Sequence, residues 1–344
     1  MSPRGAPVVI DARVAARREI GGVERVTLEM SRRLPQLRPD RYSVARPPRA
    51  LAYRAGHLWE QALLPLMARP PRLIYCPANL APVASRRTVL LIHDLAPLRY
   101  PGWYSRAFAA YQARLLPLLA RRARRIIVPS EFSRRELIEA LNLPGERISV
   151  VPNGVDESFS PSADTEPVRR AYDLSGPYVL LVGTRIARKN LTALGIAARR
   201  LRQLGLELVS AGSDRYWAQA EQPPPMRMLG YVEERHLPGL YAGATALAMP
   251  SLYEGFGLPA LEAMASAVPV VASDRGALPE VCGDAAVLVS PDNAAGLSDA
   301  LEAVVTDDRL RARLVAAGPE RAAPFRWSRT AALTDAVIGS ALDT

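Results

Sequence analysis

The segment Ser251–Ala263, SLYEGFGLPALEA, combines residue types that can bind a phosphate or a sugar. Gly255 and Gly257 permit a tight backbone, and Pro259 suits the first position of a helix. The free N–H groups and the dipole of that helix start predict an anion site at Gly257–Leu258, suited to a phosphate or a sugar hydroxyl.

Two glutamates accompany this anion site. Glu254 precedes the helix expected over Pro259–Ala267, and Glu262 lies about one turn inside it, so both can project into one cleft. Single glutamates at such places are also typical of a solvated helix start. The complete string is unusual enough to favour a ligand site.

A second cluster follows the apolar run Tyr178–Val182. In the string GTRIARKN, Arg185, Arg188 and Lys189 have the charge to hold a diphosphate. Lys189 is the only lysine among 44 basic residues, which indicates a site that needs a compact point charge in place of a planar guanidinium. A solvated basic loop and a chance lysine stay open as alternatives.

Two weaker candidates lie in the first half of the chain. Gly21 and Gly22 begin a predicted helix and let a ligand approach the backbone, although the pair is not a GxGxxG motif. His93 and Asp94 lie at the carboxyl end of an apolar strand. A histidine at the end of a strand is often structural, but the carboxyl end is also where such sheets contact a substrate. Three histidines and two distant cysteines have no zinc-ligand spacing, so no metal site is expected.

Short apolar runs alternate with amphipathic helices along the chain, which predicts parallel α/β layers. Such sheets bind ligands beyond the carboxyl ends of their strands, where all the candidates above lie. The expected helices include Gly22–Leu34, ended by Pro35, Tyr104–Arg122 and Asn190–Leu204. The expected strands are Pro7–Asp11, Leu73–Cys76, Thr88–His93, Arg125–Pro129, Ile148–Pro152, Tyr178–Val182, Leu206–Ala211, Met226–Leu229, Ala244–Met249 and Val268–Ala272.

Length and composition indicate a globular protein of two domains. The chain has 344 residues, 49% of them hydrophobic and 23% charged, and a linker is expected at Asp156–Pro167, near residue 160. The sequence contains no run of 18 apolar residues, so no membrane-spanning helix is expected. The apolar stretch near the N-terminus is about four residues long, which is too short for a signal peptide. Two cysteines cannot form a disulfide framework, which fits a reducing, cytoplasmic compartment.

Charge separates the two halves. Residues 1–160 hold 26 arginines against 13 acids, a net charge of +13, whereas the rest carries −3. Such a basic unit attracts phosphate, nucleic acid or an anionic membrane. Few aromatic residues and no recognition motif argue against nucleic acid. A membrane surface and simple decoration of a solvated face remain equal alternatives.

EGFGLPALEAMASAVPVVAS and GALPEVCGDAAVLVSPDN together resemble the C-terminal signature of the family-four retaining glycosyltransferases, which have the GT-B fold. The resemblance extends to IDARVAARREIGGVERVTLEM, LIHDLAPLRYPGWYS, VPSEFSRREL and VVPNGVD in the first half, and GTRIARKN is similar to mannosyltransferase-like members. It implies an α/β fold of two Rossmann-like domains whose parallel sheets face each other across a cleft. Residues 1–160 would bind the acceptor, 161–324 the nucleotide-sugar, and 325–344 would form a helix that crosses back to the first domain.

The resemblance also implies roles for single residues. Glu254 would contact the donor sugar, Glu262 the ribose and Lys189 the diphosphate, with His93 facing the sugar. Backbone N–H groups of Gly255, Phe256, Gly257 and Leu258 would hold sugar hydroxyls and phosphate. Tyr231 and Val232 would border the base, and Gly21, Gly22 and Asp94 would lie on the acceptor side.

Two positions depart from the family pattern. Thr184 stands where many members carry arginine, so the second cation must come from Arg185 or Arg188, and Arg188 is favoured. Ala267 replaces a common glycine, a change expected to affect only helix packing.

The implied reaction moves a hexose to a glycan or a lipid-linked glycan, and mannose from GDP-mannose is favoured. It would retain the anomeric configuration and need no metal and no cofactor, with the nucleotide-sugar as co-substrate. A transferase that uses a UDP-sugar and a nucleotide-sugar epimerase are alternatives on the same fold. A basic protein that binds a surface without catalysis is the alternative from another class. A peripheral place at the inner face of the membrane fits both the charge and a lipid-linked acceptor.

Overall fold

The computed structural model describes residues 7–48, 56–69, 71–213 and 222–343. Internal contacts divide the chain into two units. The first comprises Met1–Leu98, Ala110–Gly154 and Trp327–Thr344, and the second comprises Arg99–Ala109 and Val155–Arg326. The chain therefore visits the second unit briefly at Arg99–Ala109, enters it again at Val155 and returns to the first unit at Trp327.

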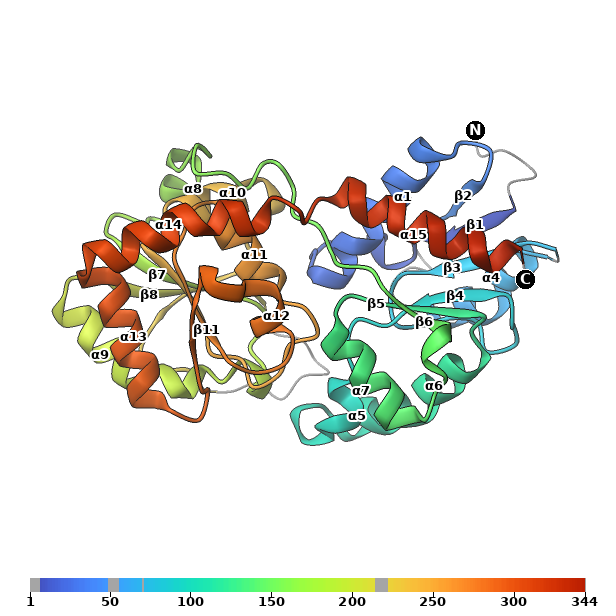
Figure 1. Cartoon of the computed structure of the whole chain (residues 1–344), viewed down its shortest axis with the longest axis horizontal. Coiled ribbons are helices and arrows are strands. Elements are labelled where there is room, and N and C mark those ends of the chain that lie inside the picture. Colours follow the sequence, from blue (N-terminus) through green and yellow to red (C-terminus); the bar gives the residue numbers. More distant parts are fainter. Residues whose placement is uncertain (1–6, 49–55, 70, 214–221, 344) are drawn as a thin grey trace. The chain divides into compact units, whose positions relative to one another are not determined.

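The sheet of the first unit is parallel throughout, with the strand order β2-β1-β3-β4-β5-β6 (Figure 1). The chain runs from β1 outward to β2 and then returns to the other side of β1, so the strand order reverses between β1 and β3. This reversal is the topological switch point, the place where open α/β sheets bind ligands. The strands are β1 (Val8–Asp11), β2 (Tyr42–Ala45), β3 (Leu73–Cys76), β4 (Thr88–Leu91), β5 (Arg125–Val128) and β6 (Ile148–Val150).

Helices and single turns connect these strands. The α-helices of this part of the chain are α1 (Gly22–Leu37), α3 (Gly56–Leu58), α4 (Leu64–Met67), α5 (Ala96–Arg99), α6 (Arg106–Arg122), α7 (Glu131–Leu141) and α15 (Trp327–Leu342). The 3-10 turns are η1 (Val14–Ala16), η3 (Pro101–Trp103) and η4 (Gly145–Arg147), whereas η2 (Trp59–Leu63) is a π-helical turn.

Helix α15 packs against α1 within the first unit (Figure 1). Its Asp335 is buried and accepts a hydrogen bond of 2.5 Å from the Tyr42 hydroxyl. Arg41 donates to the same carboxylate over 2.8 Å. Because a buried carboxylate needs such partners, these contacts fix the register of α15 on the first unit.

The second unit repeats the architecture with the strand order β12-β11-β10-β7-β8-β9, again parallel throughout. Here the order reverses between β7 and β10, which are hydrogen-bonded neighbours. The strands are β7 (Tyr178–Val182), β8 (Glu207–Ala211), β9 (Arg227–Gly230), β10 (Ala246–Met249), β11 (Val270–Ser273) and β12 (Val287–Val289). The helices are α8 (Glu166–Ala171), α9 (Gly195–Gln203), α10 (Leu237–Ala242), α11 (Leu258–Ala265), α12 (Leu278–Cys282), α13 (Ala294–Thr306) and α14 (Asp308–Ala322), with 3-10 turns η5 (Ala187–Lys189), η6 (Leu191–Leu194), η7 (Glu234–His236) and η8 (Gly283–Ala285).

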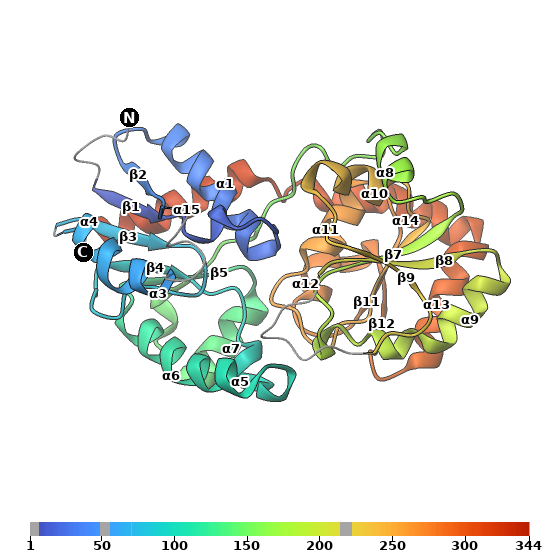
Figure 2. The same cartoon turned by 180° about the vertical axis from the view of Figure 1, so that it is seen from behind.

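The central strands of this second sheet are buried on both faces, because β7 and β10 are apolar at every position and alternate residues enter different cores. Leu180, Leu247 and Val270 belong to the core shared with α10 and α11. Val179 and Ala246 belong to the core shared with α9 and α13. Figures 1 and 2 show these two pairs of helices on opposite sides of the sheet. The parallel α/β architecture predicted from the sequence is confirmed.

Several boundaries differ from the predictions. Strands β2 and β12 were not predicted; each is a short strand at the edge of its sheet. Helix α1 continues past Pro35, because a proline so close to the end removes a single hydrogen bond, and Arg38 N–H still bonds the Leu34 carbonyl. The helix predicted over Asn190–Leu204 begins as the 3-10 turn η6 and becomes α-helical only at Gly195.

Ala267 also corrects an expectation. Its φ of 55° is left-handed, a conformation that costs a residue with a Cβ roughly 1–2 kcal/mol. The departure from glycine therefore strains the backbone after α11, where an effect on helix packing alone was expected. Within the described part of the chain, no helix is both long enough and apolar enough to cross a membrane.

Candidate functional site

The clustered charges of the second unit lie at its switch point, where the loops after β7 and β10 meet. Lys189 ends η5 in the first loop, and its Nζ lies 2.7 Å from Oε1 of Glu254 in the second. Arg188 Nη1 lies 2.9 Å from Oε2 of the same carboxylate and also donates to the Tyr253 carbonyl. The structure thus brings together three of the predicted residues. The sequence did not reveal that Glu254 is itself the partner of both cations.

The backbone around Lys189 is shaped to hold its side chain. Gly183, directly after β7, has a φ of +142°, and a Cβ at this position would lie 2.7 Å from Lys189 Cε. The Asn190 side-chain amide donates to the Pro250 and Pro291 carbonyls, which joins the Lys189 loop to the loops that follow β10 and β12. Lys189 is therefore fixed through both its stem and its neighbour.

A third loop, after β11, supports Glu254. Gly276 has a φ of +65°, and a Cβ there would lie 2.6 Å from the Glu254 carbonyl oxygen. The Ala277 N–H donates to this oxygen over 2.9 Å, and the Ser273 hydroxyl donates to the Ser251 carbonyl over 2.5 Å. Sequence reasoning missed this support; its signal is the string SDRGALPE, a glycine loop directly after an apolar strand.

The Glu254 carboxylate is charged despite its burial. Burial alone raises the pKa of a carboxyl group, but the adjacent Arg188 and Lys189 outweigh it and lower the pKa of Glu254 to about 2. At neutral pH the site therefore contains two cations and one anion.

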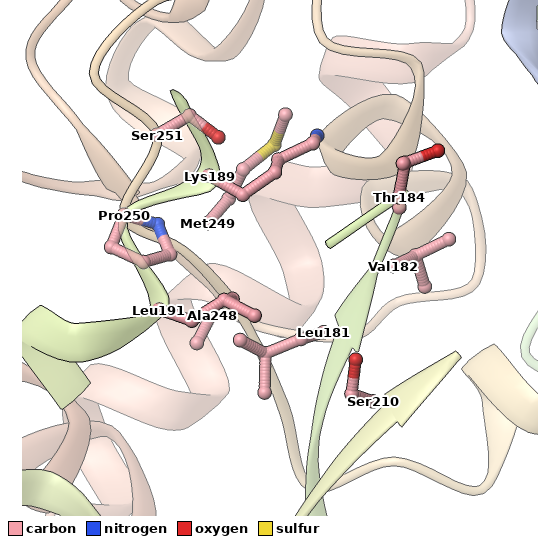
Figure 3. Close-up of a pocket in the computed structure, with 11 residues that line it drawn as sticks. Leu181, Val182, Thr184, Lys189, Leu191, Ser210, Ala248, Met249, Pro250 and Ser251 are labelled. Atoms are coloured by element: carbon pink, nitrogen blue, oxygen red, sulfur yellow. The ribbon is translucent and has the colours of Figure 1, made fainter. Parts of the chain in front are cut away.

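A small cavity of about 20 Å³ adjoins Lys189 (Figure 3). A space of this size holds about one water molecule. The hydroxyl of Ser251 is buried and has no hydrogen-bond partner among the described residues. The cavity is lined by Leu181, Val182, Gly183, Thr184, Lys189, Leu191, Ser210, Ala248, Met249, Pro250 and Ser251.

The predicted anion site lies at the start of α11. Gly257 caps the helix with a φ of 113°, Leu258 is its first residue, and Phe256 before it is buried. Glu262 lies in the second turn and is 3% exposed, so it is not the solvated surface residue that the alternative reading required.

Other predicted residues of the second unit lie near the ends of neighbouring strands. Tyr231 and Val232 directly follow β9; Val232 is buried and Tyr231 partly so. Arg185 lies on the same loop as Lys189, but the ion pairs with Glu254 come from Arg188 and Lys189. Arg188 as the second cation that holds the diphosphate stays a prediction.

The predicted residues of the first unit lie after β1 and β4. His93 is buried, and its Nε2 donates to the Pro77 carbonyl over 2.8 Å. A carbonyl only accepts, so this bond places the proton on Nε2, and burial lowers the pKa of His93 and keeps the ring neutral. Asp94 accepts from the Ala96 N–H, and Gly21 is the N-cap of α1, which begins at Gly22.

Within the described ranges, no three histidine, cysteine, aspartate or glutamate side chains gather in a way that would hold a metal ion. The two adjacent cations, Arg188 and Lys189, are an arrangement that suits a diphosphate.

Comparison with known proteins identifies the family of this chain. Residues 20–159 match the family model "Glycosyltransferase Family 4", and residues 164–321 match "Glycosyl transferases group 1". An O-antigen chain mannosyltransferase B of Escherichia coli is 33% identical over 80% of this chain and 76% of its own length. An MMP α-(1→4)-mannosyltransferase of Mycolicibacterium hassiacum is 31% identical over 70% of this chain, and the match covers 58% of that relative's own length.

Solved structures support the fold. A sucrose-phosphate synthase from Thermosynechococcus elongatus has a TM-score of 0.73 at 20% identity, covering 97% of this chain and 98% of that one. Anabaena HepE in complex with UDP and glucose has a TM-score of 0.71 at 19% identity, covering 97% and 99%. The fold is GT-B, and the chain belongs to the family-four glycosyltransferases. It is therefore an enzyme that transfers a sugar.

Proposed function

We propose that this glycosyltransferase moves mannose from GDP-mannose to a glycan or lipid-linked glycan, with retention of anomeric configuration and without a metal ion. The Lys189–Glu254–Arg188 ion cluster at the β7–β10 switch point carries the proposal. Its cations can neutralise the departing diphosphate, and the start of α11 adds N–H donors.

The proposed chemistry is one exchange at the anomeric carbon. The bond from this carbon to the diphosphate oxygen breaks, and a bond to the acceptor hydroxyl oxygen forms on the same face. The hydroxyl proton passes to the leaving diphosphate, which departs as GDP. Lys189 and Arg188 stabilise the growing negative charge, while Glu254 lies beside the sugar, where positive charge develops.

The names of the relatives support the choice of sugar. The Escherichia coli and Mycolicibacterium hassiacum relatives are both mannosyltransferases, and the former acts on an O-antigen chain. We therefore propose a role in polysaccharide assembly. A UDP-sugar-dependent transferase is the main alternative, because no residue of the site distinguishes guanine from uracil.

Thermal unfolding with GDP, UDP, ADP and dTDP tests the donor. A ligand at about 100 times its Kd stabilises a protein by roughly 2.7 kcal/mol, so we expect GDP to raise the Tm by several degrees. The exposed-residue variant Arg199→Ala should show the same shift. A shift with UDP alone would replace the proposed donor, and no shift with any nucleotide would contradict the proposed site. Release of GDP that requires an acceptor then separates a transferase from an epimerase.

We further propose that the first unit contacts an anionic membrane through helix α6. This helix, RAFAAYQARLLPLLARR, contains six basic or aromatic residues and no acidic one. Tyr111, Arg114, Leu118 and Arg121 are all exposed and follow the 3-4-3 spacing of one helix face. Cationic and apolar side chains on one face are typical of helices that lie on a membrane surface.

Co-sedimentation with vesicles tests this contact. We expect the protein to sediment with phosphatidylglycerol-containing vesicles and not with phosphatidylcholine alone, and the double variant Arg114→Glu, Arg121→Glu should lose this binding. Equal behaviour on the two kinds of vesicle would show that the arginines merely decorate a solvated surface.

A further inference from the structure

The switch point of the first unit has its own polar network, separate from the residues used above. It is built by three consecutive residues, Trp59, Glu60 and Gln61, on the π-helical turn η2. Such turns are rare and occur frequently at functional sites, because they change the directions in which successive side chains point. Here the three side chains reach the two loops that flank the β1–β3 switch point.

Two of the contacts go to the loop after β1. Trp59 Nε1 donates to Oδ1 of Asp11, the last residue of β1, over 3.4 Å. Arg13 Nη2 lies 3.1 Å from Glu60 Oε2, and the Arg13 N–H also donates to Asp11. The side chains that make these contacts are all buried: Asp11, Arg13, Trp59 and Glu60. They therefore fix the position of the loop that leads from β1 toward α1.

The third contact goes to the loop after β3. Gln61 donates to the Ala81 carbonyl over 3.0 Å and accepts from the Val83 N–H over 2.8 Å. The same loop contributes the Pro77 carbonyl that holds the His93 ring. The side chains of η2 therefore connect both sides of the switch point, and the loop after β3 in turn holds His93 through the Pro77 carbonyl.

The ion pair in this network is poorly explained by stability alone. Glu60 is completely buried, and burial raises its pKa to about 7 although Arg13 lowers it. Buried ion pairs are often no more stable than apolar residues of similar volume. An arrangement with this desolvation cost, located where open α/β sheets bind ligands, indicates that its geometry serves binding.

We propose that Trp59, Glu60 and Gln61 are positioning residues, which set the loops after β1 and β3 so that the first unit can receive the acceptor. The proposal rests on the proposed function, because it assumes that the first unit binds the acceptor. The three side chains act through the loops and do not touch the reacting atoms.

Steady-state kinetics with GDP-mannose and α-linked mannobiose test the proposal on the full chain. For Glu60→Gln and Gln61→Ala we expect the KM for mannobiose to rise about tenfold. The KM for GDP-mannose should stay within twofold of the value for the unaltered enzyme, and GDP should raise the Tm as it does in that enzyme. Glu139→Gln, an exposed residue of α7 in the same unit, is the matched control and should leave both KM values unchanged. Equal changes in both KM values, or no change, would overturn the proposal.

Amide hydrogen exchange gives a second readout that needs no substrate. In Gln61→Ala we expect faster amide exchange at residues 77–83. In Glu60→Gln we expect faster amide exchange at residues 12–21, and in both variants the exchange of α15 should be unchanged. If Glu60→Gln fails to fold, Trp59→Phe, which removes only the bond to Asp11, replaces it. If exchange in these loops is unaltered, the positioning role is overturned, whatever the donor is. If exchange is altered but the enzyme neither binds GDP nor uses mannobiose, only the proposed function is overturned.

Discussion

Replacing Glu254 by glutamine should lower kcat by about 10²–10³ and, at the same time, tighten the binding of GDP about tenfold. Each carboxylate oxygen of Glu254 holds one cation, Lys189 or Arg188. The diphosphate that we propose to bind here needs the same two cations and is repelled by the carboxylate. Glutamine removes the competing charge but also removes the anion beside the sugar.

Isothermal titration with GDP and initial-rate kinetics measure the two effects. Glu262→Gln is the matched control, because Glu262 is also buried but is proposed to bind the ribose, so its loss should weaken GDP binding. Glu254→Gln should also lower the Tm in the absence of GDP, since it leaves two cations without their anion. Weaker GDP binding by Glu254→Gln, or a nearly normal kcat, would contradict the assigned role.

The second large effect is expected at Lys189. Lys189→Ala should reduce kcat by about 10²–10³, because it removes a fixed positive charge from the leaving group. Lys189→Arg should restore little of this activity. The Lys189 side chain is 11% exposed, and its stem passes so close to Gly183 that a Cβ there would lie 2.7 Å from Lys189 Cε. A planar guanidinium cannot reproduce the compact point charge that the ammonium group holds in this confined position.

Single-turnover rates with saturating donor check this prediction, because they separate the chemical step from donor binding. Arg199→Ala on α9 changes an exposed basic residue of the same unit and should keep the rate of the unaltered enzyme. A Lys189→Arg variant with nearly full activity would show that charge alone suffices and that the shape of the site does not matter.

The strands of both sheets were largely predictable. Tyr178–Val182 and Leu73–Cys76 match β7 and β3 at both ends, because a strand buried on two faces is an unbroken apolar run between turn residues. The edge strand Tyr42–Ala45 escaped prediction because its run of four residues is interrupted by a serine. Its pairing with β1 comes from the sheet and not from its own composition.

The candidate site was predictable in its residues but not in its connections. Lys189 and Glu254 are 65 positions apart, and only the adjacency of β7 and β10 brings them within 2.7 Å. The network of Trp59, Glu60 and Gln61 was missed for a related reason. A π-helical turn has no periodic signature in the sequence, and its partners follow two different strands.

Helix α15 follows the second unit in the sequence, yet it belongs to the first unit, most of which is synthesised earlier. Most of the second unit, Val155–Arg326, is synthesised while the nascent first unit still lacks the helix that packs against α1. At about 5–20 residues per second, synthesis of that unit takes roughly 10–30 seconds. During this interval the partners of Asp335, Tyr42 and Arg41, lack their carboxylate, and the apolar face under α15 is open to chaperones.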